Sequence, residues 1–141
     1  MSQITGVDKK DVKELSSLLN KCFYKAESGN FIINWYHVYG DPKKYKENNF
    51  IMKKDNKIVG HIGVFPMKFT TMGDTLLVGG IGGVATDEAC RGQGIMTQLL
   101  NYAIEIMQKR KYDISILGGD RQRYGHFGWE LAGKETNFII N

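Results

Sequence analysis

The sequence predicts one α+β domain in which a mixed, mostly antiparallel sheet is flanked by helices. Three observations predict this class. An amphipathic helix pattern precedes the strands, three strand-like runs follow one another through very short links, and a long helix then leads into another strand. Because 141 residues is the size of one ordinary domain, we assign residues 1–141 to a single unit.

The N-terminal third is predicted to hold a short strand and two helices. We expect the strand at residues 4–7, followed by Asp8 as a helix N-cap. Apolar residues then recur along residues 12–23 at the spacing of one helix face, which predicts an amphipathic helix. The apolar and aromatic segment 31–39 predicts a second helix that ends at Gly40.

Three strand-like runs occupy the middle of the chain, at residues 49–53, 57–69 and 75–86. The links between them, residues 54–56 and 72–74, contain Asp, Asn or Gly and have the turn chemistry of hairpins. Links this short cannot carry a parallel crossover. The three runs are therefore predicted to form an antiparallel meander.

A long helix and two further strands complete the predicted fold. Apolar positions at helical spacing predict an amphipathic helix over residues 94–109. We expect a strand at residues 112–117, a short polar turn or helix at 121–126, and a last strand at 129–140. Because the long helix lies between two strands, it forms one βαβ-like crossover and makes the sheet mixed.

The loop Arg91-Gly92-Gln93-Gly94 joins the meander to the long helix. It brings unpaired backbone N–H groups and the positive end of a helix dipole together, which predicts an anion site with Arg91 as its cation. The Rossmann fingerprint needs a third glycine early in a βαβ unit, and the Walker loop needs Gly-Lys followed by Ser or Thr; neither is present. Four glycines on the preceding strand are interpreted as relief of crowding or as a bulge: Gly79, Gly80, Gly82 and Gly83.

Two motifs in this region resemble those of GCN5-related N-acetyltransferases. Val84-Ala85-Thr86, then Arg91-Gly92-Gln93-Gly94-Ile95 and a helix, is similar to that family's coenzyme A-binding motif, Gln/Arg-x-x-Gly-x-Gly/Ala. About thirty residues later, Tyr124-Gly125-His126-Phe127-Gly128-Trp129-Glu130 looks like the family's Tyr-x-x-Phe-Gly-Phe-Glu segment. Within the family, the chain looks closest to the enhanced intracellular survival type.

The resemblance implies an acyl-coenzyme A N-acyltransferase fold with acetyl-CoA as the cosubstrate. Backbone groups of Val84 and Thr86 would pair with the pantetheine arm, and the glycine loop would hold the diphosphate. The cofactor-binding residues implied in this way are Val84, Ala85, Thr86, Arg91, Gly92, Gln93, Gly94, Ile95, Met96 and Thr97. Two positions depart from the family pattern, because Ala89 stands where the motif has Gln or Arg and Met96 replaces a small residue.

The implied reaction is direct acetyl transfer to a primary amine of a small molecule or protein. Tyr124 is the candidate general acid, since a phenol can protonate the departing thiolate. The sequence does not identify the general base; the candidates are His37, His61, His126, Glu27 and Glu88. A lone histidine on a strand, such as His61, is more typical of a hydrogen-bonded core residue than of a base. A non-catalytic acyl-CoA-binding or regulatory module and a nucleotide or phosphate binder of unrelated fold remain as alternatives.

Composition argues against several other classes of protein. The net charge of +4 is spread along the chain, so we expect no nucleic-acid partner, and no apolar run approaches the ~20 residues that cross a membrane. The first residues lack the basic and apolar pattern of a secretion signal, and the two cysteines lack metal-ligand spacing. We therefore expect a cytoplasmic protein without a metal, for which a homo-oligomer is compatible with the sequence.

Overall fold

The computed structural model describes residues 3–24, 30–39, 41 and 44–133. It confirms the predicted α+β class, with one five-stranded mixed sheet of strand order β1-β2-β3-β4-β5 in the described chain. The strands are β1 (Gln3–Gly6), β2 (Asn49–Lys54), β3 (Lys57–Thr71), β4 (Asp74–Thr86) and β5 (Ile114–Leu117). The helices of the same residues are η1 (Lys9–Asp11), α1 (Val12–Phe23), α2 (Phe31–Asn34), α3 (Tyr36–Tyr39), α4 (Tyr45–Asn48), η2 (Glu88–Cys90), α5 (Ile95–Lys109), α6 (Arg121–Tyr124) and η3 (Gly125–Phe127).

The strands β2, β3 and β4 form the predicted antiparallel meander. The two residues between β2 and β3, Asp55 and Asn56, have φ values of 49° and 62°, as a type I′ hairpin turn requires. Met72 and Gly73 make the next turn with φ values of 48° and 90°. Helix α5 then returns the chain so that β5 pairs parallel to β4, which confirms the predicted crossover.

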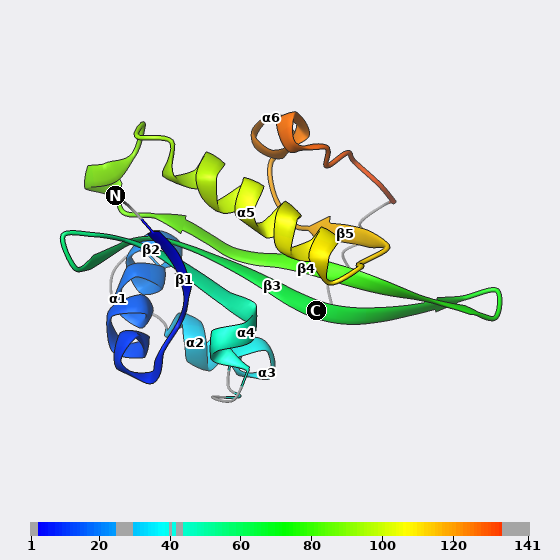
Figure 1. The fold of residues 1–141 in the computed structure, drawn as a ribbon, viewed down its shortest axis with the longest axis horizontal. Coiled ribbons are helices and arrows are strands. Elements are labelled where there is room, and N and C mark those ends of the chain that lie inside the picture. Colours follow the sequence, from blue (N-terminus) through cyan, green and yellow to red (C-terminus); the bar gives the residue numbers. More distant parts are fainter. Residues whose placement is uncertain (1–2, 25–29, 40, 42–43, 134–141) are drawn as a thin grey trace, which may run out of the picture.

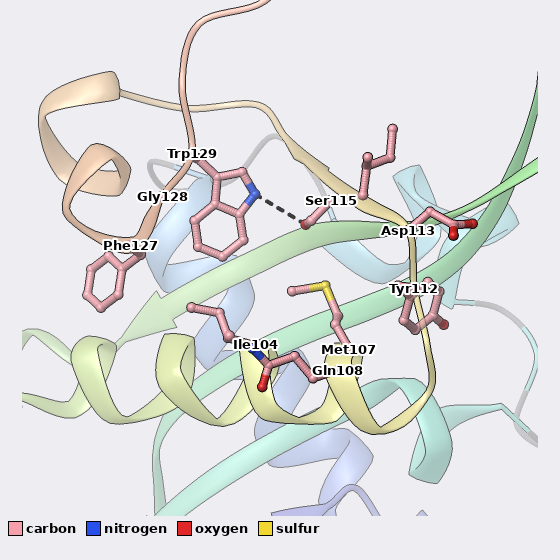
Figure 2. A pocket seen from close by; sticks show the side chains of 10 residues that line it. Ile104, Met107, Gln108, Tyr112, Asp113, Ser115, Phe127, Gly128 and Trp129 are labelled. Atoms are coloured by element: carbon pink, nitrogen blue, oxygen red, sulfur yellow. Dashed lines mark hydrogen bonds between the residues drawn. The ribbon is translucent and has the colours of Figure 1, made fainter.

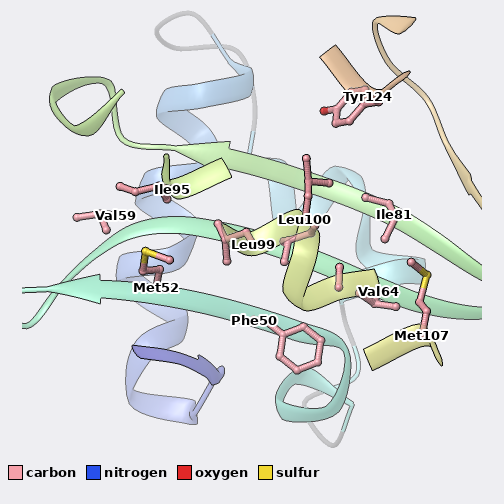
Figure 3. Packing of buried hydrophobic residues seen from close by; sticks show 12 residues of the cluster. Phe50, Met52, Val59, Val64, Ile81, Ile95, Leu99, Leu100, Met107 and Tyr124 are labelled. Carbon is pink, nitrogen blue, oxygen red and sulfur yellow. The ribbon is translucent and has the colours of Figure 1, made fainter. Parts of the chain in front are cut away.

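Helices cover both faces of the sheet (Figure 1), with α5 on one face and α1 to α4 on part of the other. Each side has its own apolar cluster. The cluster under α5, drawn in Figure 3, contains Phe50, Met52, Val59, Ile62, Val64, Ile81, Ile95, Leu99, Leu100, Ala103, Met107 and Tyr124. The cluster under α1 contains Val7, Leu15, Leu18, Leu19, Phe31, Tyr39, Tyr45, Ile51, Ile58 and Ala85. Both clusters therefore hold β2 to β4 from opposite sides.

The segment that follows η3 is tied to the sheet by two consecutive hydrogen bonds. Trp129 Nε1 donates to Ser115 Oγ at 3.2 Å, and Ser115 Oγ donates to the Gly79 carbonyl at 2.7 Å. Figure 2 shows the indole turned toward Ser115, beside a shallow groove of about 260 Å³ between α5, β5 and this segment. The chain after Tyr124 is thereby anchored to β4 and β5.

Two predicted elements differ from the structure. The second helix is broken into α2 and α3 at Trp35, whose ψ of 33° is not helical. This segment is rich in β-branched and aromatic side chains, which lose rotamer freedom in a helix. The last strand is wrong for residues 129–133, where Gly133 has a φ of 76° and follows Gly128 at 98°, a backbone region that strands do not use. Residues 134–140 and Gly40 lie outside the described residues.

Candidate functional site

The strands β4 and β5 pair over only part of the length of β4. In the described chain, residues 78–81 of β4 pair with residues 114–117 of β5, and the register ends at Ile81 and Leu117. The last residues of β4, 82–86, pair with β3 on their other side. One edge of this final stretch therefore has no strand neighbour among the described residues.

A β-bulge lies in this unpaired stretch. His61 pairs with Ala85 and Gly63 with Gly82, so Gly83 and Val84 together oppose one residue of β3. Gly83 has a φ of 60°, and a Cβ there would lie 2.4 Å from the Tyr39 hydroxyl. Elsewhere on β4, a Cβ at Gly79 would lie 2.5 Å from Met107 Sδ. The prediction that the strand glycines relieve crowding or form a bulge is confirmed at these positions.

The turn between β4 and α5 presents an open backbone. Gly92 and Gly94 have φ values of 78° and 74°, and a Cβ built at either one meets no atom within 4 Å. Gly94 is the N-cap of α5 and provides no side-chain cap, so the first amides of this 15-residue helix lack partners in the helix itself. Their N–H groups point out of the helix at the positive end of its dipole, where an anion is stabilised.

A cleft of about 550 Å³ joins the end of β4 to this turn. Every predicted cofactor-binding residue except Gln93 lines it: Val84, Ala85, Thr86, Arg91, Gly92, Gly94, Ile95, Met96 and Thr97. Gln93 turns away, and its Oε1 accepts a hydrogen bond of 3.2 Å from Lys54 Nζ beside a separate pocket. The sequence motif thus folds into one continuous surface, with one side chain directed elsewhere.

Four residues outside the predicted cofactor-binding set also line the cleft: Cys22, Phe23, Cys90 and Arg123. Arg123 adds a second cation to the lining of the cleft. The side chain of the first, Arg91, is 63% exposed, and its guanidinium lies 3.8 Å from the Glu88 carboxylate. Such an exposed pair is worth only ~0–1 kcal/mol, so Arg91 can exchange it for another anion. Cys22 Sγ contacts the Thr86 carbonyl at 3.6 Å, and burial raises the pKa of this thiol.

Tyr124 lies at the edge of the core under α5 rather than in the lining of this cleft. Its side chain is 7% exposed, and its ring occupies the space beside Gly119, where a Cβ would lie 2.5 Å from Tyr124 Cε2. Its neighbour Arg123 does line the cleft. Figure 3 shows the ring beyond β4, with the hydroxyl turned toward the end of that strand.

The base candidates differ sharply in their surroundings. His61 is fully buried, and both ring nitrogens are engaged, Nδ1 with the Gly83 carbonyl at 2.7 Å and Nε2 with Asn49 Oδ1 at 3.0 Å. Burial lowers the pKa of His61 to about 4, although the bond to Gly83 acts in the opposite direction. His61 is therefore the hydrogen-bonded core residue that its isolation on a strand indicated. His126 and Glu88 are exposed, whereas Glu27 and the side chain of His37 lie outside the described part.

The comparison with known families agrees with this geometry. A family model described as "Acetyltransferase (GNAT) domain" matches residues 3–132. The chain belongs to the GNAT acetyltransferase family. Among curated relatives of this GNAT protein, the uncharacterized N-acetyltransferase YhbS of Escherichia coli K12 is 30% identical over 78 residues. That match covers 55% of this chain and 46% of YhbS, so it spans about half the length of the curated relative.

Solved structures share the GNAT fold at low sequence identity. A predicted acetyltransferase with acetyl-CoA from Clostridium acetobutylicum is 21% identical, with a TM-score of 0.80 over 99% of this chain and 96% of its own. A transcriptional regulator from Bacillus halodurans is 22% identical, with a TM-score of 0.74 over 99% and 100%. A probable N-acyltransferase from Enterococcus faecalis is 18% identical, with a TM-score of 0.76 over 92% of this chain but 32% of its own. These similarities establish the fold.

No group of three or more His, Cys, Asp or Glu side chains in the described part of the GNAT chain is arranged to hold a metal ion. None of its helices combines the length and the apolar character needed to span a bilayer.

Proposed function

We propose that this GNAT protein is an acetyl-CoA-dependent N-acetyltransferase that transfers the acetyl group directly to a primary amine of a small molecule or protein. The observation that carries the proposal is the single cleft that joins the unpaired end of β4 to the N-terminus of α5. Acetyl-CoA itself is extended, with a diphosphate at one end and a thioester at the other. A cleft with an open strand edge beside an anion site suits both parts.

The diphosphate would lie on the turn that contains Gly92 and Gly94. A single helix terminus stabilises a surface anion by only ~0.3–1 kcal/mol, so several amides and a cation must act together. Arg91 and Arg123 are the cations of the described chain that line the cleft. A side chain at either glycine would stand between the ligand and the amides, which gives the two positive φ values a functional reason as well as a geometric one.

The pantetheine arm would run along residues 84–86 like an added strand, and bring the thioester to the bulge. There the neutral amine attacks the carbonyl carbon, the new C–N bond forms, and the C–S bond breaks. The Val84 N–H would stabilise the oxyanion that develops in between. Tyr124 would give its phenolic proton to the departing thiolate, and the excess proton on the amine would leave to a base or to water.

The group that accepts the proton of the amine is either water or an exposed side chain. An alkylamine with a pKa of ~10.4 must lose a proton before it can attack, at a cost on the order of 4–5 kcal/mol at pH 7. His61 is a poor candidate, because both of its ring nitrogens are engaged in the core. Of the candidates named from the sequence, Glu88 and His126 have exposed side chains among the described residues, and we propose that one of them or water accepts this proton.

The proposal is tested by measuring free coenzyme A thiol after acetyl-CoA is mixed with a panel of primary amines. We expect acceptor-dependent thiol release in the wild-type protein and a loss of turnover in Tyr124→Phe without loss of coenzyme A affinity. Full turnover in Tyr124→Phe would remove that residue from the mechanism. Binding of acetyl-CoA without thiol release for any acceptor would instead identify a non-catalytic acyl-CoA-binding or regulatory module.

Three finer points belong to the same proposal. We assign the chain to the enhanced intracellular survival type on the likeness of residues 59–67, of Gly94 with Met96, and of residues 117–119. A cytoplasmic location is supported by the free Cys22 and Cys90, since thiols stay reduced there. The oligomeric state can be read directly from light scattering, where a homo-oligomer would give a multiple of the chain mass of 16.0 kDa.

A further inference from the structure

The short hydrogen bond to Gly83 fixes the tautomer of His61. The Gly83 carbonyl can only accept, so at a distance of 2.7 Å the Nδ1 atom must carry the hydrogen. In the neutral ring Nε2 then has a lone pair and accepts. The structure places Asn49 Oδ1 3.0 Å from Nε2, and the tautomer set by Gly83 is matched there once the Asn49 amide is flipped, so that its NH2 group takes the place of Oδ1 and donates to that nitrogen. The imidazole is therefore a fixed donor that points at one backbone carbonyl of β4.

That carbonyl belongs to the peptide unit at the bulge. Gly83 and Val84 share one β3 partner, so the regular ladder cannot serve both residues. The bond from His61 satisfies the partly buried Gly83 carbonyl, which the bulge removes from the regular ladder. His61 thus supplies, from inside the core, the hydrogen bond that the Gly83 carbonyl lacks in the ladder.

The same bond also determines where the next N–H points. A trans peptide is planar, with its C=O and N–H directed to opposite sides. The Gly83 carbonyl and the Val84 N–H are the two ends of one such plane. When His61 draws the carbonyl into the core, the Val84 N–H is directed away from the core, on the residue that lines the cleft.

We propose that His61 is a positioning residue, which holds the Gly83–Val84 peptide by its carbonyl and so aims the Val84 N–H at the oxygen of the bound thioester. The inference rests on the proposed acetyltransferase function and adds a buried residue to it. His61 touches neither cosubstrate nor acceptor. It acts through one rigid peptide, and the general base is a different group.

The packing around Gly83 supports this role. Gly83 has a φ of 60° and lies close to the Tyr39 hydroxyl and the His61 ring. A Cβ added to this glycine would be 2.4 Å from that hydroxyl and 3.0 Å from the ring. Tyr39 is itself 3% exposed and stacks edge-on against Phe65 at a ring distance of 5.2 Å. The bulge is therefore clamped on the core side by two buried rings, and the peptide has little room to rotate.

Two substitutions separate positioning from packing. His61→Asn keeps an amide nitrogen near the place of Nδ1, within reach of the Gly83 carbonyl, but leaves a cavity toward Asn49. His61→Gln is closer to histidine in volume and extends toward Asn49, but its nitrogen lies near the place of Nε2. A histidine that only fills space predicts that Gln is the better replacement. A histidine that holds the carbonyl predicts that Asn is better.

The test is steady-state kinetics of both variants with acetyl-CoA and the most active amine of the panel, at saturating concentrations. Because a misplacement of ~1 Å costs about 100-fold in rate, we expect kcat of His61→Gln to fall by roughly 50-fold or more and kcat of His61→Asn to stay within about fivefold of wild type. The KM for acetyl-CoA should change by less than about threefold in both, since the anion site lies on another segment.

Each outcome decides the inference. An equal loss of kcat in the two variants, or a smaller loss in His61→Gln, overturns it while the acetyltransferase function stands. A wild-type protein without thiol release overturns both. If His61→Asn does not fold, imidazole ¹⁵N NMR of the wild-type protein decides instead: a hydrogen on Nδ1, with a shift of the Val84 amide signal on adding acetyl-CoA, supports the role. A hydrogen on Nε2, or an unchanged Val84 signal, contradicts it.

Discussion

The burial of His61 predicts a loss of stability in mildly acidic solution. Burial lowers the pKa of this imidazole to about 4, from the ordinary value of 6.5 that applies to the unfolded chain. Between these two values the unfolded chain binds a proton at this position and the folded protein does not. Stability must therefore fall as the pH decreases from 6.5 toward 4, and this contribution is complete above pH 6.5.

The magnitude follows from the two pKa values. A difference of about 2.5 pH units corresponds to roughly 3 kcal/mol, of which about 2 kcal/mol is lost between pH 7 and pH 5. Burial acts to raise the pKa of Asp11, but the hydrogen bonds that it accepts from Lys53 and from the Asp8 N–H hold this pKa below its ordinary value of 3.8. The stability that this carboxylate contributes is therefore lost in a separate window, below pH 3.8. The loss between pH 6.5 and 5 can therefore be attributed to His61 apart from that carboxylate.

The assay is urea unfolding followed by circular dichroism at pH 7.5, 6.5, 5.5 and 5.0, with His61→Asn as the control. This variant keeps the donor to Gly83 but cannot titrate, and it retains the other two histidines. We expect the wild-type free energy of unfolding to fall by about 2 kcal/mol more than that of the variant over this range. Parallel curves for the two proteins would refute the reasoning, because they would mean that His61 accepts a proton in the folded state at no cost.

Three more outcomes follow from the glycines and from Tyr39. Gly83→Ala should lower the free energy of unfolding by about 2–4 kcal/mol, because alanine is strained at this φ and its Cβ clashes with the Tyr39 hydroxyl. In the double variant with Tyr39→Phe, which removes this hydroxyl, part of the loss should be recovered. An equal loss with and without the hydroxyl would contradict the clash. Tyr39→Phe alone should stabilise the protein by about 1 kcal/mol in thermal unfolding, because the buried hydroxyl has no hydrogen-bond partner among the described residues; a clear destabilisation would indicate a missed partner. Gly94→Ala should weaken coenzyme A binding about tenfold or more in calorimetry and lower the free energy of unfolding by about 1 kcal/mol. The control is Gly125→Ala, at a position that is equally open but has no positive φ, and it should change neither the affinity nor the stability.

The order of elements could be predicted because it depends on local sequence. Asp55 and Asn56 tolerate the positive φ of a two-residue turn, and this fixes the hairpin between β2 and β3. The apolar stripe of α5 has a clear helical period, and its buried residues Leu99, Ala103 and Met107 fall on it. The anion site around Gly92 and Gly94 could be predicted for the same reason, since both glycines lie on one short turn.

The rest of the site depends on contacts between distant segments. Cys22 and Arg123 reach the same cleft from positions about a hundred residues apart, and no local pattern marks either one. The bulge at Gly83 is set by the register with β3, which one strand of sequence does not reveal. The signal available for Arg123 was its position next to Tyr124 in the second family motif. The signal for His61 was a polar ring among buried neighbours, which predicts hydrogen bonds without naming their partners.

The most direct test of the central claim is a crystal structure of the protein with bound coenzyme A. We predict the diphosphate against the backbone N–H groups of residues 92–97, with Arg91 or Arg123 beside it, and the pantetheine arm along the open edge of residues 82–86. A cofactor found in the groove between α5 and Trp129 instead, or a turn that stays empty at saturating coenzyme A, would contradict the account.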